Sequence, residues 1–253
     1  MNDFIDAHVA DDARRHWHWS CDLLRTQHHA LIPGVVMGLE TKVTQHAWQD
    51  FTNHWNRLTL DRHMGDGGTY RLRRYGQFDT RRDGSLRLRA HEAYEQPRDV
   101  NPLNGGVKRH FDPLEPSFAA HRVLRDVLER LRMMVDRAAG GRTDWNIRLH
   151  PYRILARDGA PGQPTPEGLH RDGVDYVVSM LVSRHNVKGG QTTVTDTRGA
   201  TLSTLTLQGA MSTLIADDAK TMHAVSAIEP LVRGKPAWRD VLVVAFTRAG
   251  AAT

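Results

Sequence analysis

The chain has 253 residues, of which 40% are hydrophobic and 25% are charged, and its formal net charge is +5 at pH 7. This length allows a sizeable buried core, and the longest apolar runs, at residues 30–39 and 241–246, are far shorter than the ~20 residues that span a bilayer. The single cysteine, Cys21, excludes an internal disulfide, and the first thirty residues lack a basic segment followed by an apolar one. We therefore expect a cytoplasmic protein without a membrane partner.

The N-terminal residues 1–30 carry several histidines and tryptophans, but their spacing neither repeats nor matches a known metal site. We interpret this segment as a partly ordered arm. From Thr41 to Leu58, apolar residues recur at intervals of three and four, which predicts a helix with a wide buried face. A Gly-Asp-Gly-Gly segment at residues 65–68 ends this pattern.

Residues 69–94 alternate between apolar and charged side chains on both sides of the turn Arg82-Asp83-Gly84, which predicts a β-hairpin. Arginine supplies 29 of the 34 basic residues, and its densest stretch, residues 71–89, is interleaved with aromatic residues. A groove for stacked nucleic-acid bases has this composition, but so does a solvated pair of strands, which is the interpretation that we prefer. Charge alone identifies no partner.

The loop at residues 96–116 holds four of the eleven prolines and is either a lid or a simple connection. Ser117 is a candidate N-cap for an amphipathic helix that extends to Ala138 and ends at Gly140-Gly141. These residues complete the predicted helical and hairpin support, residues 31–144.

Short β-rich runs separated by glycine-containing turns follow residue 144. They are residues 145–156, 176–183, 192–197, 202–207, 211–216, 223–228 and 241–248. This spacing is typical of a sandwich, barrel or jelly roll. We predict an α+β, mainly β fold in one domain, residues 1–253, with N-terminal helices packed against a β-rich core at residues 145–248.

One stretch of this core, residues 167–173, indicates a metal site. Because a single residue separates His170 from Asp172, both side chains point to one side of an extended segment. A second strand that carries His223 would complete two imidazoles and one carboxylate, the arrangement of Fe(II) enzymes that activate oxygen. A structural role is the alternative, since the tripeptide 110–112 has the same spacing inside a loop.

With these motifs, residues 145–248 resemble the double-stranded β-helix (jelly-roll, cupin-like) core of the Fe(II)- and 2-oxoglutarate-dependent dioxygenases. The matching segments are Glu-Gly-Leu-His-Arg-Asp-Gly at 167–173, Gly-Gly-Gln-Thr-Thr-Val at 189–194, Met-His-Ala-Val at 222–225 and Arg-Asp-Val-Leu-Val-Val-Ala-Phe at 239–246. With residues 71–78 and 101–114 included, the whole chain resembles the branch that contains bacterial L-isoleucine hydroxylases and biofilm, stress and motility proteins.

The resemblance implies that His170, Asp172 and His223 ligate iron. It also implies that an arginine at the start of the last core strand, the position of Arg239, binds the distal carboxylate of 2-oxoglutarate through two parallel hydrogen bonds. Arg233 is the rival for that role, and a surface strand cap is the other interpretation of Arg239.

Tyr152 is a candidate contact of the cosubstrate, although core packing with a satisfied hydroxyl explains it equally well. Asp172 favours hydroxylation or desaturation over halogenation, because related halogenases have a small residue at this position.

The implied activity is hydroxylation of a small molecule, such as a free L-amino acid, with Fe(II), 2-oxoglutarate and O2 consumed to give succinate and CO2. A cation for the substrate's carboxylate could come from Lys108 or Arg109 in the loop, which also carries Asn101 and Asn104, or from Arg171. The alternatives are an enzyme of this fold that acts on nucleic acid or protein, and a non-catalytic stress or motility factor.

Overall fold

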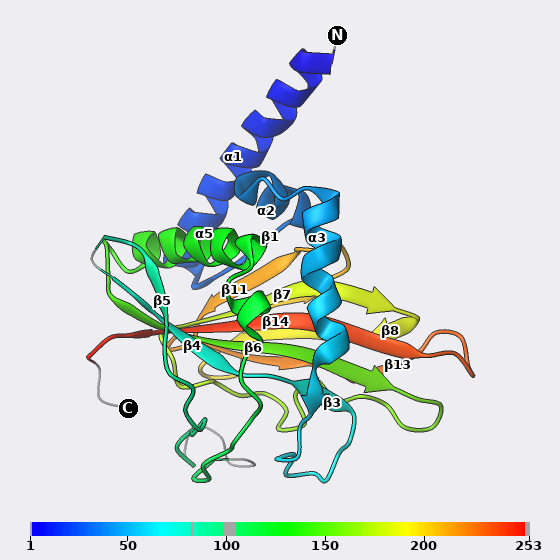
Figure 1. Ribbon diagram of the computed structural model, residues 1–253. Helices are drawn as coiled ribbons and strands as arrows, with labels where there is room; N and C mark the ends of the chain where they lie inside the picture. The colour runs from blue at the N-terminus through cyan, green and yellow to red at the C-terminus, as the bar shows by residue number, and fades with distance from the viewer. Residues whose placement is uncertain (1, 82, 99–104, 251–253) are drawn as a thin grey trace.

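A layer of helices covers one face of a large antiparallel sheet in the computed structural model, which describes residues 2–81, 83–98 and 105–250 (Figure 1). The helices are α1 (Asn2–Gln27), α2 (Gly34–Thr41), α3 (Gln45–Thr52), the 3-10 helix η1 (Asn53–Arg57), α4 (Pro116–Ala119) and α5 (Arg122–Ala138). No helix in this part of the chain is both long enough and apolar enough to cross a membrane.

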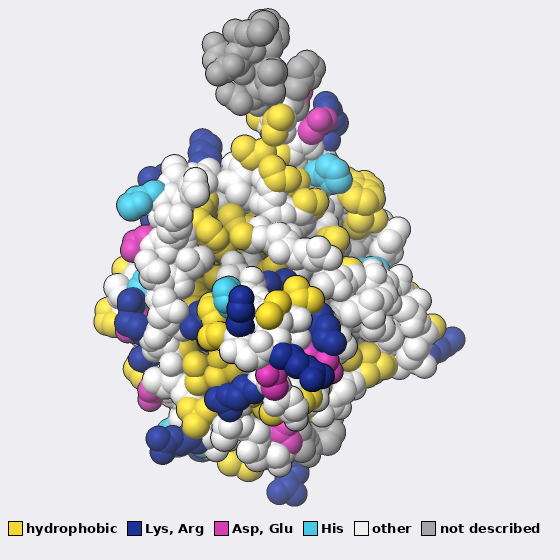
Figure 2. Space-filling view, turned by 90° about the vertical axis from the view of Figure 1, so that its right-hand side faces the viewer, with side chains coloured by type: hydrophobic (Ala, Val, Ile, Leu, Met, Phe, Trp, Pro, Cys, Tyr) yellow, Lys and Arg dark blue, Asp and Glu magenta, His cyan; other side chains and the backbone are white. Residues whose placement is uncertain are grey.

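The N-terminal segment forms the helix α1 at residues 2–27, which the sequence analysis did not predict. Its buried hydrophobic positions recur at intervals of three and four, and they are Ala13, Trp17, Cys21 and Leu24. These side chains pack into the main core, while the start of α1 projects from the body (Figure 1). Hydrophobic side chains are exposed where α1 leaves the body (Figure 2), and Val9 and Trp19 are among the exposed residues of this helix.

Two helix starts differ from the sequence prediction because side chains cap them elsewhere. Thr44 accepts a hydrogen bond from the backbone N–H of Ala47, so the helix predicted from Thr41 begins at Gln45. Ser117 lies inside α4, and the His121 side chain caps the longer helix α5.

The large sheet has the strand order β1-β11-β7-β14-β6-β3-β2, with β4 beside β6 and β5 beside β4. Its strands are β1 (His29–Ile32), β2 (Thr59–Leu60), β3 (Arg71–Arg73), β4 (Gly76–Thr80), β5 (Leu86–Leu88), β6 (Trp145–Ala156), β7 (Tyr176–His185), β11 (Thr213–Asp217) and β14 (Ala237–Arg248). The smaller sheets are β10-β9-β12, made of Thr201–Thr206, Gln191–Asp196 and Thr221–Val225, and β13-β8, made of Ile228–Pro230 and Val187–Gly189.

Each β-rich run predicted after residue 144 contains a strand, and the predicted α+β, mainly β class is confirmed. The predicted hairpin is also present, since Phe78 pairs with Leu88 and Thr80 with Leu86. Residues 71–73, however, pair with β6 and not with β5. The single-domain organisation of residues 1–253 stays a prediction.

Alternation along β14 directs one set of side chains to the helices and the other to the smaller sheet. Leu242, Val244 and Phe246 belong to the main core with the helices. Val241, Val243 and Ala245 line a cavity that residues of β9 and β12 also line. Because successive side chains of a strand point to opposite faces, Arg239 shares the cavity side.

Candidate active site

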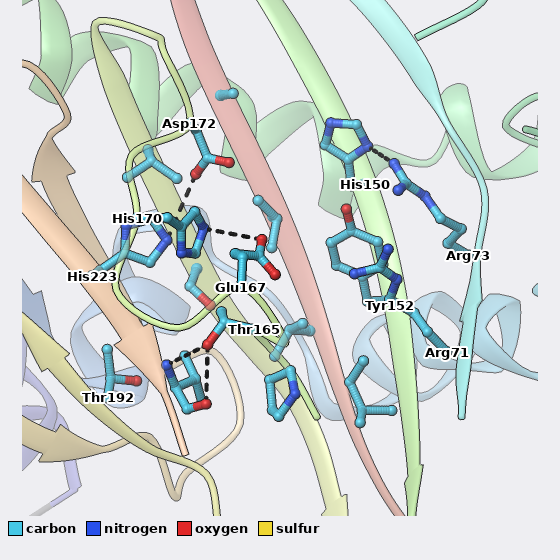
Figure 3. Close-up of a pocket in the computed structure, with 18 of the residues that line it drawn as sticks. Arg71, Arg73, His150, Tyr152, Thr165, Glu167, His170, Asp172, Thr192 and His223 are labelled. Atoms are coloured by element: carbon cyan, nitrogen blue, oxygen red, sulfur yellow. Dashed lines mark hydrogen bonds and ion pairs between the residues drawn. The ribbon is translucent and has the colours of Figure 1, made fainter. Parts of the chain in front are cut away.

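A cavity lies between the large sheet and β9 and β12, and charged and aromatic side chains line it (Figure 3). Its walls come from β6, β7, β11 and β14 on one side and from β9 and β12 on the other. The segment before β7 and the described parts of the loop at 96–116 close it further.

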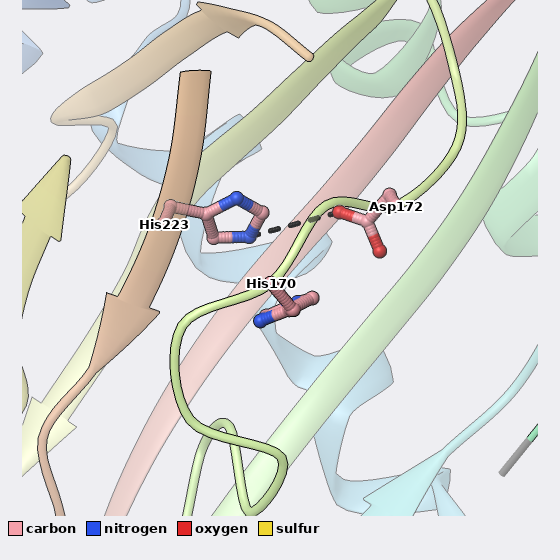
Figure 4. Close-up of side chains that lie close together, drawn as sticks. All are labelled: His170, Asp172 and His223. Atoms are coloured by element: carbon pink, nitrogen blue, oxygen red, sulfur yellow. Dashed lines mark ion pairs between the residues drawn. The ribbon is translucent and has the colours of Figure 1, made fainter. Parts of the chain in front are cut away.

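His170, Asp172 and His223 meet at one side of this cavity (Figure 4). One ligand atom from each residue lies within 4.8 Å of the others, and Nε2 of His223 is 3.6 Å from Oδ2 of Asp172. His170 and Asp172 do not open a strand, as the sequence had suggested, but lie in the segment between β6 and β7. The predicted convergence is therefore present on a different local structure.

Pairing with β12 positions the first histidine. The backbone N–H of His170 donates to the carbonyl of His223 at 3.1 Å, and that of His223 donates back at 2.9 Å. Upstream, Oγ1 of Thr165 donates to the Val225 carbonyl and accepts from its N–H, at 3.1 and 2.9 Å. These contacts hold the segment along the strand, so the two imidazoles lie with their centroids 4.4 Å apart.

Asp218 holds the loop that carries Asp172, and sequence reasoning missed it. Its side chain is fully buried, and its two oxygens accept the backbone N–H groups of Asp172, Gly173 and Val174 at 3.0, 2.8 and 3.1 Å. Arg171, a predicted substrate contact, donates instead to the Asp218 carbonyl at 2.6 Å and is not a wall of the cavity. The available sequence signal was an Asp-Asp pair in the turn before β12.

Burial and neighbouring charges affect the protonation of the two imidazoles in different directions. Nδ1 of His170 donates to the Gly168 carbonyl at 2.9 Å, so Nε2, which lies 3.6 Å from Oε1 of Glu167, is the nitrogen that can bind a cation once it has lost its proton. Burial disfavours the charged ring, but the carboxylates of Asp172 and Glu167 raise the pKa of His170 overall. Burial and the charge of His170 lower the pKa of His223 to about 3, so this ring is neutral at neutral pH. Burial also raises the pKa of Asp172.

Arg239 lines the same cavity, and some of its hydrogen-bond donors are unpartnered. It is 2% exposed, and its Nε and Nη2 have no partner. Burial and the nearby Arg184 lower its pKa to about 10, so it still carries its charge at neutral pH. Tyr152 lines the cavity and stacks on His150 with centroids 5.8 Å apart. Arg233 is exposed in the turn between β13 and β14 and is not among the walls.

Arg71 and Arg73 are not solvated strand residues, so that prediction is wrong. They are 7% and 2% exposed and line the cavity, because β3 pairs Arg71 with Ile154 and Arg73 with Tyr152. The Asp61 carboxylate lies 2.8 Å from Arg71 and 3.6 Å from Arg73. Alternation of charged and apolar residues was the right signal, but the charged face is the inner one.

The loop at residues 96–116 contributes two side chains to the cavity. Gln96 donates to the backbone carbonyl of Asp172 at 3.2 Å, and Arg109 donates to the Gln96 side chain at 2.7 Å. Lys108 is exposed. Two further candidates lie outside the described residues, Asn101 and Asn104.

Other histidine-containing segments form no comparable group in the part of the chain that the structure describes. In the tripeptide 110–112, His110 and Asp112 are exposed, while Phe111 is buried against Tyr75 and Tyr94. The shared spacing therefore does not make a metal site there.

Comparison with known proteins identifies the family, because the model of the 2OG-Fe dioxygenases matches residues 52–245. The chain belongs to the 2OG-Fe dioxygenase family. This dioxygenase is 26% identical over 235 residues to the 3(1)-hydroxy-L-isoleucine 4-dioxygenase of Pantoea ananatis, a match that covers 89% of the chain and 94% of the relative.

Two solved structures share the fold of the dioxygenase. A bsmA homolog from Methylobium petroleophilum PM1 superposes with a TM-score of 0.84 at 33% identity, over 94% of this chain and 95% of that one. The IDO of Bacillus thuringiensis superposes with a TM-score of 0.74 at 17% identity, over 92% and 96%. The predicted double-stranded β-helix core with N-terminal helices is thereby confirmed.

As a member of this family, the protein is an enzyme that uses Fe(II), 2-oxoglutarate and O2. The residues present fit those groups. Two imidazoles and a carboxylate are the donor set of non-haem iron, and a buried guanidinium with unpartnered donors suits a carboxylate ligand.

Proposed function

We propose that the dioxygenase hydroxylates a free L-amino acid or a similarly small molecule. The name of the Pantoea ananatis relative supports this class, since that enzyme acts on a hydroxylated isoleucine. The observation that carries the proposal is the placement of the His170–Asp172–His223 group and Arg239 in one partly closed cavity.

Each residue takes a specific role in this proposal. His170, Asp172 and His223 hold Fe(II), with Nε2 of His170 as its ligand atom because Nδ1 is committed to the Gly168 carbonyl. Arg239 binds the distal carboxylate of 2-oxoglutarate, and Arg233 does not, because it is exposed outside the cavity. Iron and 2-oxoglutarate, when bound, supply the oxidising power that converts a C–H bond to an alcohol while succinate and CO2 are released.

Two alternatives from the sequence, a nucleic-acid substrate and a non-catalytic role, are less well supported by the structure. A nucleic-acid substrate was suggested by the arginine-rich hairpin, but Arg71 and Arg73 are buried. On the face shown in Figure 2, Lys and Arg side chains are interspersed with Asp, Glu and hydrophobic ones, so they make no continuous basic patch there. A non-catalytic factor has no physical need for a complete ligand group together with a buried Arg239.

Anaerobic addition of Fe(II) and 2-oxoglutarate tests the cofactor assignments. We expect a visible metal-to-ligand charge-transfer band that is lost in His170→Ala and Asp172→Ala. The matched controls are His110→Ala and Asp112→Ala, which change the exposed tripeptide of the same spacing and should keep the band. Absence of the band in folded wild-type protein would contradict the assignments.

A panel of L-amino acids then tests the substrate class. We expect one or more of them to stimulate O2-dependent succinate release above the rate without substrate. If the charge-transfer band forms but no amino acid in the panel raises succinate release, the amino-acid proposal is wrong while the iron site stands.

A further inference from the structure

Across the cavity from the metal ligands, three arginines approach one another, and we call them the arginine cluster (Arg71, Arg73 and Arg109). All three are buried and line the cavity, and Figure 3 shows Arg71 and Arg73 on the side opposite His170 and Asp172. The cluster is separate from Arg239, the proposed partner of the cosubstrate.

Arg109 has no anionic partner. Within the described ranges, no carboxylate oxygen lies within 4.0 Å of its guanidinium, although the side chain is 3% exposed. Its Nη2 donates to Gln96, its guanidinium lies 4.7 and 5.9 Å from the ring centroids of Tyr94 and Phe111, and its Nε has no partner. A buried cation without a counter-ion is strongly unfavourable unless a ligand supplies one.

Arg73 is likewise a buried guanidinium without a hydrogen-bonded carboxylate. Its guanidinium stacks on Phe111 at 3.5 Å, and its Nε also lacks a partner. Asp61 approaches it at 3.6 Å but makes its hydrogen bond, at 2.8 Å, with Arg71. Asp61 therefore pairs with two of the three guanidiniums and does not contact Arg109, which leaves the cluster with a positive excess.

His150 adds a neutral donor beside the cluster. Burial, followed by the charge of Arg73, lowers its pKa well below the ordinary value, so the ring is uncharged. Its Nδ1 is hydrogen-bonded to Arg73, and because a guanidinium can only donate, Nδ1 accepts and the proton resides on Nε2. In Figure 3 the second ring nitrogen points away from Arg73, which leaves its N–H for another group.

We propose that the arginine cluster is a second anion subsite, in which Arg73 and Arg109 bind the carboxylate of the substrate. This rests on the proposed function and narrows its substrate to molecules with a free carboxylate, so a residue inside a peptide is excluded. An anion held there keeps the α-carbon on the arginine side, and the rest of the substrate extends towards the metal ligands. Two guanidiniums with unpartnered Nε–H groups can each contribute a charge-assisted hydrogen bond.

The test measures binding, independently of turnover, as the change in the anaerobic charge-transfer band when an amino acid is added. The probe is the L-amino acid of the panel with the largest effect, compared with its carboxamide. In wild type the carboxamide should bind at least about tenfold more weakly, because each charge-assisted hydrogen bond contributes ~1.5–3 kcal/mol.

Arg73→Met and Arg109→Met should each lower the affinity for the amino acid about tenfold or more, while the affinity for the carboxamide stays within about twofold. The affinity for 2-oxoglutarate should not change. Lys108→Met is the matched control, since it removes the same charge from the neighbouring exposed position and should leave both affinities unchanged. If a Met variant fails to fold, the corresponding Gln variant replaces it.

Several outcomes would overturn the proposal. Variants that bind the amino acid like wild type would remove the subsite, and equal losses for acid and carboxamide would indicate a structural role. Loss of 2-oxoglutarate binding would assign the cluster to the cosubstrate. In all three cases the wild-type band and its response to amino acids remain, whereas failure of the proposed function would remove that band or that response in wild type.

Discussion

Replacing Asp218 by asparagine should loosen the loop that carries Asp172 and weaken Fe(II) binding. In the wild-type protein Oδ2 of Asp218 accepts the N–H groups of Gly173 and Val174, and Oδ1 accepts that of Asp172. Asparagine has one oxygen, so it can keep the two bonds made to Oδ2 but turns an NH2 group towards the N–H of Asp172. The bond that is lost therefore belongs to the proposed metal ligand.

The magnitude follows from that one bond. A hydrogen bond to a charged acceptor contributes ~1.5–3 kcal/mol to stability. Burial and the negative charge of Asp172 raise the pKa of Asp218, so removal of its charge also relieves a repulsion. We therefore expect the free energy of unfolding of the metal-free protein to fall by the lower value, about 1.5–2 kcal/mol. Fe(II) affinity should fall ~10- to 100-fold, as is usual when a group that orients a ligand is lost.

Urea unfolding of the metal-free protein and anaerobic Fe(II) titration with saturating 2-oxoglutarate measure the two quantities. Asp196→Asn is the matched control, because Asp196 accepts the N–H groups of Arg198 and Ala200 at 2.9 and 2.8 Å in the β9–β10 turn. Both bonds are accepted by Oδ1, which asparagine keeps, so this variant should change stability by no more than about 0.5 kcal/mol and should leave Fe(II) affinity unchanged. Wild-type Fe(II) affinity in Asp218→Asn, or an equal loss in Asp196→Asn, would refute the reasoning.

Three further predictions test other parts of the structure. Arg239→Met should raise the dissociation constant for 2-oxoglutarate at least about tenfold in titrations of the charge-transfer band, while Arg233→Met should not; equal effects would contradict the assignment. Thr44→Ala should lower the free energy of unfolding by about 1 kcal/mol in urea, because the N-cap bond to Ala47 is lost, with no change in succinate release. Burial raises the pKa of the Cys21 thiol to about 11, so iodoacetamide at slightly alkaline pH should modify it only after unfolding, as mass spectrometry would show. Modification of the folded protein at the rate of a free cysteine would show that the thiol is accessible.

The core strands could be predicted because they are short runs rich in residues that favour β-structure. The run at residues 145–156 coincides with β6, and the run at 241–248 lies within β14. Glycine-containing turns separate these strands, and such turns can be recognised locally since glycine adopts the backbone conformations that they need. For the same reason the hairpin of β4 and β5 was visible in the sequence.

Prediction failed where partners distant in the chain determine burial. Arg71 and Arg73 have the alternation of a solvated strand, yet contact with β6 turns them inward, where Asp61 and aromatic rings offset part of the cost of their desolvation. The helix α1 was missed because its charged residues obscure a buried stripe that only packing against the main core reveals. The segment of His170 looked like a strand, but its backbone makes only a single bridge to β12.

The sequence by itself determined the donor types and the strand-rich core, because these depend on residue chemistry and short-range periodicity. The tertiary structure decided that Arg239 and not Arg233 enters the cavity, that Asp218 holds the loop of the proposed ligand Asp172, and that buried arginines face the proposed metal ligands. These facts depend on which strands pair and in what register, and no local pattern specifies contacts between residues so far apart in the chain.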